Sequence, residues 1–188
     1  MSTSTERFSS LAIFLHWSIA LGIILNILLA WIWPFMSDDG FASLLTVHKS
    51  IGITIFGLAV MRLIWRLAHH PPRSPDGYQR WEIAASHITH TMLYAVMFIM
   101  PLTGWITDSA WADAANHPMH YFFAFEWPRI SFIRALAPEI KEKVFQDSMT
   151  IHNYTSYLIY VLLFLHICGA LKHQLFDGER ALQRMWFR

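Results

Sequence analysis

Six histidines lie inside the long apolar stretches of this 188-residue chain, where ionisable side chains are uncommon. Such a residue indicates a functional site, because its polar nitrogens are costly to bury in hydrocarbon without a partner. Neutral imidazole is a common ligand of transition metals. No Asp or Glu lies inside the stretches to complete a hydrolytic site. The six are His16, His48, His87, His90, His152 and His166.

His152 and His166 are fourteen residues apart in one apolar stretch. At about 1.5 Å per residue, this spacing corresponds to about 21 Å along a helix. Fourteen steps of about 100° bring both imidazoles to the same helix face. One helix would therefore present a histidine to each half of a bilayer.

The elements that must position these histidines are membrane-spanning helices. A helix needs about 20 mostly apolar residues to cross the hydrocarbon core, and four stretches qualify, at residues 10–33, 46–67, 83–107 and 150–171. Hydrophobic residues make up 55% of the chain and charged residues 14%, against about 25% charged in an average soluble domain. This composition argues against a soluble globular protein and excludes a disordered chain. We predict an all-α integral membrane protein, with residues 1–188 forming a single domain built on a four-helix bundle.

The remaining composition narrows the chemistry and the partners. Cys168 is the single cysteine, which excludes a disulfide scaffold and a thiolate-based zinc or iron–sulfur site. A net charge of +1 gives no reason to expect nucleic acid as a partner. Membrane lipid is the partner that the apolar stretches predict.

The loops predict the orientation. With both termini on one side, nine of the 14 Lys and Arg residues fall on that side and five on the other. The positive-inside rule then predicts that both termini are cytoplasmic. On the outer side we expect a short loop at residues 38–45 and a long one at residues 108–149. Residues 130–145 of the long loop alternate apolar and charged positions, which predicts a short amphipathic helix over the outer face.

The antiparallel order of the spans predicts histidine pairs. His16 lies near the inner end of the first span, level with His166. His48 lies at the outer end of the second span, level with His152. Two imidazoles on opposite faces of a planar macrocycle give a six-coordinate haem iron suited to electron transfer. The spacing therefore favours two haems. The alternative is a haem-free structural protein, because a single histidine in a span more often hydrogen-bonds to another helix than binds a metal.

Short motifs around these histidines resemble the prokaryotic cytochrome b561 family over nearly the whole chain. The resemblance implies a multi-pass protein of the bacterial inner membrane with two haem b groups. It implies the same ligands as the spacing, His16 with His166 and His48 with His152. The matching segments are FLHW at 14–17, VHKSIG at 47–52, RLIWR at 62–66, ASHITH at 85–90, LH at 165–166 and LQRM at 182–185.

The same resemblance implies transmembrane electron transfer between a periplasmic donor and membrane quinone. Some relatives oxidise superoxide and reduce ubiquinone, so on that resemblance the chain would be an oxidoreductase of the superoxide:ubiquinone type. Five basic against eight acidic residues on the outer side do not favour steering of an anion by net charge. The alternative is a cytochrome b anchor subunit that relays electrons for a periplasmic redox partner protein.

Five further polar side chains near the span ends are candidate contacts of these cofactors. Arg62 and Arg66 suit the propionates of the inner haem, and Lys49 suits those of the outer haem. Interfacial anchoring is the alternative for these basic residues. One of His87 and His90 would give a proton or a hydrogen bond to a quinone near the inner haem. A hydrogen bond to a propionate or to a neighbouring helix is the alternative for the two histidines.

Overall fold

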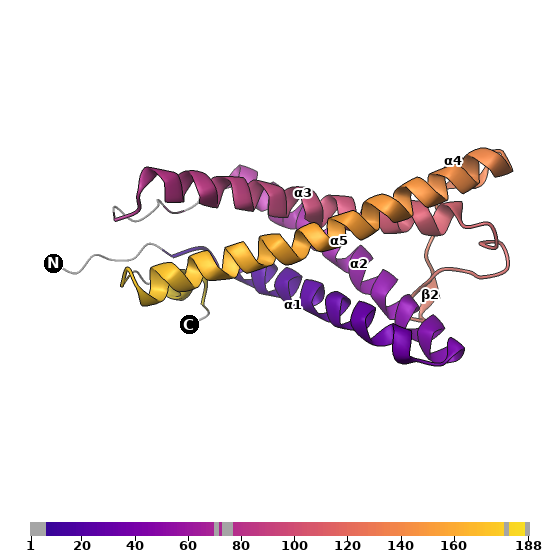
Figure 1. Cartoon of the computed structure of the whole chain (residues 1–188), viewed down its shortest axis with the longest axis horizontal. Helices are drawn as coiled ribbons and strands as arrows, with labels where there is room; N and C mark the ends of the chain where they lie inside the picture. The colour runs from indigo at the N-terminus through magenta and orange to yellow at the C-terminus, as the bar shows by residue number, and fades with distance from the viewer. Residues whose placement is uncertain (1–6, 70–71, 73–76, 179–180, 187–188) are drawn as a thin grey trace.

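The computed structural model describes residues 7–69, 72, 77–178 and 181–186. Within these residues, four long helices are each long and apolar enough to cross a membrane (Figure 1). The prediction of an all-α bundle with four membrane-spanning helices is confirmed. The four are α1 (Ser10–Ile32), α2 (Asp38–Ala68), α3 (Arg80–Ala110) and α5 (Pro138–Leu175). The short elements are η1 (Trp33–Phe35), β1 (His120–Tyr121), β2 (Phe125–Glu126), α4 (Ser131–Arg134) and η2 (Leu182–Met185).

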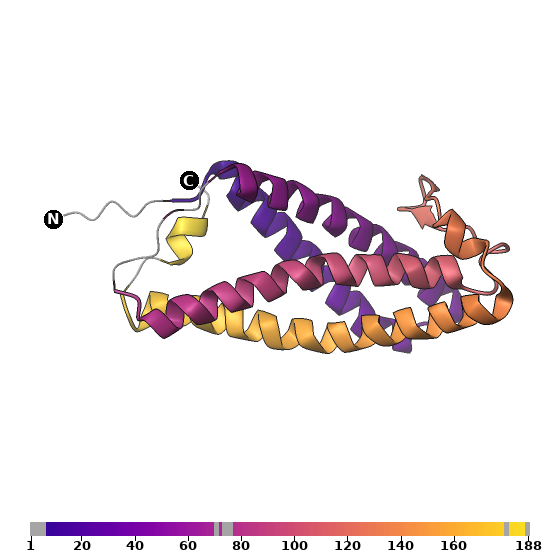
Figure 2. The ribbon, with the colours of Figure 1, turned by 90° about the horizontal axis from the view of Figure 1, so that it is seen from above.

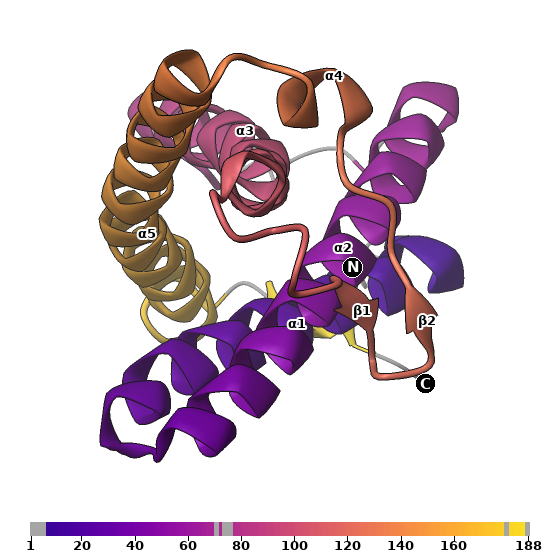
Figure 3. The same cartoon turned by 90° about the vertical axis from the view of Figure 1, so that its right-hand side faces the viewer.

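The long helices alternate in direction, so both ends of the chain lie at one end of the bundle, which we call the terminal end (Figures 1 and 2). The opposite end, the loop end, carries the antiparallel hairpin β1–β2 and the single turn α4. Seen from the loop end, α3 lies beside α5, and α1 lies beside α2 (Figure 3). Helix α2 also packs against α3, which joins the two helix pairs.

Two apolar clusters fill the middle of the bundle. One joins α1, α2 and α3 through residues that include Ile19, Ile55 and Met97. Gly22 allows this close packing, because a Cβ atom there would lie only 3.0 Å from the Cγ1 atom of Ile55. The other cluster joins α3 and α5. The core therefore lies between the two ends of the bundle.

Helix α2 begins eight residues before the predicted span, so the predicted loop at residues 38–45 was wrong. The hydroxyl of Ser37 accepts a hydrogen bond from the backbone N–H of Gly40 at 3.3 Å and caps the helix. Asp38 and Asp39 lie in the first turn, where the helix dipole favours negative charge. Hydropathy detected only the part of α2 that suits the membrane, whereas the capping residues set where the helix begins.

The predicted helix over residues 130–145 was wrong in extent. Only Ser131–Arg134 forms a separate helical turn, α4. Pro138 then begins α5, twelve residues before the predicted span. Proline is tolerated at the first position of a helix but not in its interior, because it lacks an N–H group. It therefore divides this charged segment between two helices.

The turn of the hairpin has an unusual backbone. Phe122 and Phe123 have φ angles of 45° and 62°, the left-handed region that bulky residues rarely adopt. Each such residue costs about 1–3 kcal/mol and persists only where its surroundings hold it. The N–H of Ala124 donates to the carbonyl oxygen of Tyr121 at 2.9 Å and closes the turn.

Candidate functional site

At the loop end, His48 of α2 faces His152 of α5. Their ring centroids are 6.4 Å apart, and the ring planes are inclined at 63°. His48 was predicted to open its span, but it lies ten residues inside α2 because that helix starts early. A cavity of about 530 Å³ with a mainly apolar lining is bordered by both histidines. The sequence predicted that these two side chains lie level with each other, and this geometry agrees with that prediction.

Two glycines leave room beside this pair. Gly52 lies one turn after His48, and a Cβ atom there would meet only the side-chain nitrogen of Asn26, at 3.8 Å. A Cβ atom at Gly104 would lie 3.4 Å from the Cε1 atom of His152. Both glycines line the cavity. The helix backbones can therefore approach a flat group that lies between the imidazoles.

Hydrogen bonds orient the ring of His152. Its Nδ1 atom lies 3.1 Å from the carbonyl oxygen of Met100 and 3.1 Å from the hydroxyl of Thr103. Because a carbonyl oxygen can only accept, Nδ1 carries the proton, and in neutral imidazole the lone pair is then on Nε2. The Nδ1 atom of His48 is buried with no hydrogen-bond partner among the described residues. This arrangement leaves nitrogen atoms available at the cavity.

At the terminal end, His16 of α1 faces His166 of α5. Their ring centroids are 6.1 Å apart, and the planes are inclined at 58°. A third imidazole, that of His90 on α3, lies 5.2 Å from His166 and is edge-on to it. The Nδ1 atom of His90 lies 3.3 Å from the hydroxyl of Ser86. The sequence predicted the first two as a pair, and the structure adds His90 to the same group.

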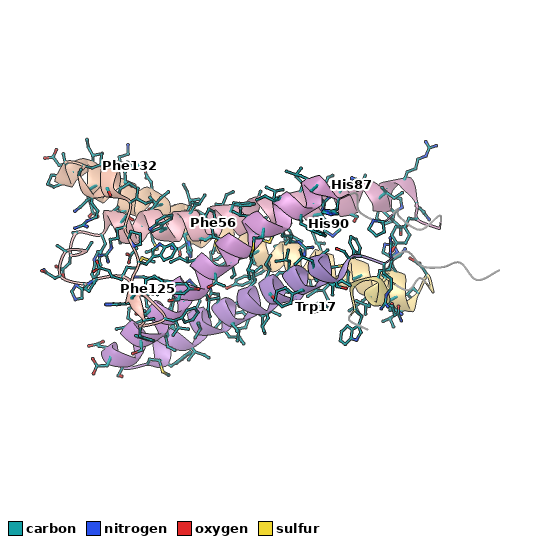
Figure 4. All side chains as sticks on the ribbon, turned by 180° about the vertical axis from the view of Figure 1, so that it is seen from behind. Trp17, Phe56, His87, His90, Phe125 and Phe132 are labelled. Carbon is teal, nitrogen blue, oxygen red and sulfur yellow. The ribbon has the colours of Figure 1, made fainter. Side chains whose placement is uncertain are left out.

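The remaining candidate side chains lie in different surroundings. Arg62 donates to the carbonyl oxygen of Ala12 at 3.1 Å, one helical turn from His16, so its charge lies beside the terminal-end pair. Arg66 lies over the ring of Tyr94 at 5.2 Å and is exposed, which suits interfacial anchoring. His87 is exposed on α3, one turn from His90 (Figure 4). Of these side chains, only Arg62 is placed directly beside a predicted ligand.

Lys49 takes part in a buried charge network that the sequence did not reveal. The carboxylate of Asp108 accepts from Lys49 and, at 2.7 Å, from Nε of Arg129. The side chains of Asp108 and Arg129 are only 3% and 5% exposed. Arg129 also donates to the carbonyl oxygens of Ala114 and His117, so it fixes the loop after α3. The only signal in the sequence was an Asp directly after the third apolar stretch.

A second charge cluster ties the terminal ends of α3 and α5 together. Lys172 donates to the carboxylates of Glu82 and, at 2.8 Å, of Asp177. His173 lies 2.7 Å from the same carboxylate of Asp177 and stacks on Tyr78 at 3.9 Å between ring centroids. The hydrogen bond from Lys172 lowers the pKa of Asp177 below the ordinary range of an aspartate. The cluster anchors the chain where it leaves α5.

Acidification should loosen this anchor. A carboxyl group whose pKa is lowered on folding stabilises the fold above its unfolded value, and this contribution is lost as the pH falls through the lowered value. In a Cys168→Ala background, a nitroxide at Leu182→Cys should become more mobile below about pH 4. With Asp177→Asn the label should already be mobile at neutral pH. If the mobility of the label did not change with pH in the protein that keeps Asp177, this role of Asp177 would be contradicted.

The fold and the paired imidazoles define a multi-pass membrane protein whose bundle offers facing side chains at both ends, the kind of site in which helix bundles hold cofactors. Residues 7–188 match the family model described as prokaryotic cytochrome b561, and the chain belongs to this family. It is 25% identical over 187 residues to cytochrome b561 homolog 2 of Escherichia coli (strain K12), covering 98% of this chain and 93% of the relative. It is 24% identical over 182 residues to cytochrome b561 homolog 1 of the same strain, covering 96% and 97%.

Family membership confirms the resemblance seen in the sequence. It identifies a bacterial inner-membrane protein with b-type haem that transfers electrons across the membrane.

The ring-centroid separations of both histidine pairs are compatible with two imidazoles on one iron. An imidazole nitrogen binds a metal at about 2 Å and lies about 1.1 Å from its ring centroid, so two ligands on opposite faces of one iron have centroids about 6.2 Å apart. The two pairs are at 6.1 Å and 6.4 Å. The 5.2 Å between His90 and His166 is too short for this arrangement. The residues present therefore fit a haem between the two histidines of each pair.

Proposed function

We propose that the protein carries electrons through two b haems, from a periplasmic donor at the loop end to membrane quinone at the terminal end. His48 and His152 would ligate one haem, and His16 and His166 the other. The observation that carries this proposal is the presence of two facing imidazole pairs at opposite ends of one bundle, each at the ligand spacing. When bound, each haem supplies a one-electron redox centre, and the chain holds it in place and limits access.

Helix α5 contributes one ligand to each site and sets the distance between them. Fourteen residues at about 1.5 Å place His152 and His166 about 21 Å apart along the helix. Between them, Ile159 and Leu162 pack against Val96 in a buried apolar cluster. This cluster makes the path between the sites apolar, which disfavours the passage of protons and ions.

The direct environment of each pair supports these ligand roles. Met100 and Thr103 hold the ring of His152 with Nε2 unprotonated, which is the form that binds iron. Arg62 places a positive charge beside His16, where it suits a haem propionate. Lys49 borders the loop-end cavity and suits a propionate there, although it shares its charge with Asp108.

The quinone would bind at the terminal end. His90 lies beside His166 without the spacing of a second ligand pair, so its imidazole is available to donate a hydrogen bond or a proton. Exposed His87, one turn away on the same helix, would exchange protons with the surroundings. The excess of basic residues on the terminal side supports a cytoplasmic location for both termini.

Superoxide is the donor that we propose for the loop end. The two cations Lys49 and Arg129 around the one carboxylate of Asp108 leave a local charge of +1, which favours an anion beside the cavity that Lys49 and Asp108 line. These three residues are part of the acidic balance of the outer side, so the attraction is confined to their own surroundings. In this role the protein would be a superoxide:ubiquinone oxidoreductase.

Steady generation of superoxide should reduce the haem of the purified, haem-loaded protein. The absorption bands of reduced haem should appear rapidly, should be suppressed by superoxide dismutase, and should disappear when ubiquinone is added. Dithionite gives the reference for full reduction. Bands that respond to dithionite but not to superoxide would exclude superoxide as the donor.

The second candidate function is an anchor subunit for a periplasmic redox protein. It is favoured by the segment between α3 and α5, which Arg129 fixes through two backbone carbonyl groups and which lies at the loop end (Figure 3). Co-purification of a periplasmic redox protein that reduces the haem, together with failure of the superoxide experiment, would favour this function.

A further inference from the structure

The hairpin β1–β2 presents four aromatic side chains within five residues. Three of them, Phe122, Phe123 and Phe125, are 43%, 61% and 51% exposed. A turn with positive φ at both central residues normally carries Asn and Gly, because they adopt this backbone at little cost. Two phenylalanines hold these positions here. The hairpin therefore keeps large apolar rings on its outer side at the expense of backbone strain.

The fourth aromatic residue and the turn attach the hairpin to the flank of α2. The hydroxyl of Ser50 accepts the N–H of Phe122 at 2.8 Å, and the hydroxyl groups of Tyr121 and Thr54 are 2.9 Å apart. Ser50 and Thr54 lie twelve and sixteen residues inside α2. The hairpin thus lies alongside a membrane-spanning helix, not above its end. Ser50, which is fully buried, satisfies a backbone donor that lipid would leave unpaired.

The same stripe of α2 continues as a lipid-facing surface. Gly57 and Met61 follow Thr54 by three and seven residues, so they share its face of the helix. A Cβ atom at Gly57 would meet nothing within 4 Å, and Met61 is 51% exposed. In a membrane-spanning helix such positions contact lipid. The hairpin is therefore bordered by lipid on the side toward the middle of the bundle.

We propose that the hairpin inserts its aromatic turn into the leaflet at the loop end, as an interfacial anchor of the bundle. The partner is the boundary between acyl chains and headgroups, where aromatic side chains are favoured. The hairpin projects from the outside of the bundle (Figure 2), and Phe125 lies at the loop end beside α2 (Figure 4). The strand ends His120 and Glu126 are polar and suit the headgroup side.

A nitroxide on the turn tests this placement. In a Cys168→Ala background, Phe123→Cys is labelled and the full-length protein is reconstituted in phosphatidylcholine vesicles. Collision rates are measured with oxygen, which concentrates in lipid, and with a water-soluble nickel chelate. The label at position 123 should collide with oxygen several-fold more often than with the nickel chelate. A label at the lipid-facing position Leu28→Cys should show the same preference. A label at exposed Asn116→Cys should show the reverse.

Two results would overturn the proposal. A nickel accessibility at position 123 equal to that at position 116 would place the turn in water. Low accessibility to both reagents that rises when the protein is diluted in lipid would show that a second copy of the chain covers the turn. Neither result depends on the haem ligands or on the electron donor.

Discussion

Replacing His16 or His166 with alanine should yield a protein that binds one haem instead of two. Replacing His48 or His152 should remove the other haem and leave the first. A b-type haem is held by its axial ligands and by packing, without a covalent bond to the chain, so loss of one imidazole removes much of its binding free energy. Haem extracted per protein chain measures this directly. A redox titration should show that the two groups of variants retain centres of different potential.

His87→Ala is the matched control for these variants. It removes an imidazole from the same end of the bundle, but an exposed one outside either pair. The control should keep two haems per chain. Loss of a haem in this variant together with full retention in His16→Ala would show that the pairing is wrong.

Asp108→Asn should destabilise the protein by about 3 kcal/mol, since removing one partner of a buried ion pair leaves the other charge uncompensated. The substitution keeps the size of the side chain but removes the charge between Arg129 and Lys49. The guanidinium of Arg129 is 5% exposed and cannot recover its hydration, whereas Lys49 at 24% exposed recovers part of it. Thermal and denaturant unfolding in detergent measure the loss of stability. Faster proteolysis between α3 and α4 should accompany it.

Asp147→Asn provides the comparison, because this aspartate is exposed on α5 and its loss should change stability by less than about 0.5 kcal/mol. Adding Arg129→Gln to Asp108→Asn should restore part of the lost stability, since the uncompensated charge is then also removed. Equal stability of Asp108→Asn and Asp147→Asn would mean that the network does not contribute to the fold.

The membrane-spanning helices and the level pairing of the histidines were predictable because both depend on simple periodicity. Apolar runs reveal the spans, and alternating direction places His16 opposite His166 once the spans are known. The spacing of His152 and His166 needed only the pitch of the helix. These are local or one-dimensional properties of the chain.

Features outside the hydrocarbon core were harder to predict. The early start of α2 depends on a cap at Ser37 and on charges that the hydropathy pattern treats as loop. The contact between Asp108 and Arg129 joins residues 21 positions apart through an irregular segment, for which no periodicity exists. The placement of His90 beside His166 required the lateral packing of α3 on α5, which sequence spacing does not define.

Helix α5 carries one histidine of each proposed haem pair and so fixes the distance between the two pairs, which limits how the chain can change length. Insertion of one residue between His152 and His166 would rotate one imidazole by about 100° relative to the other, so one of the two sites would lose its ligand. Insertion of about one whole turn would keep both imidazoles on one face but would increase the distance between the two sites by about 5.4 Å. Variation in length is therefore expected in the loops of related chains, whereas this fourteen-residue interval of α5 should tolerate substitutions but not insertions or deletions.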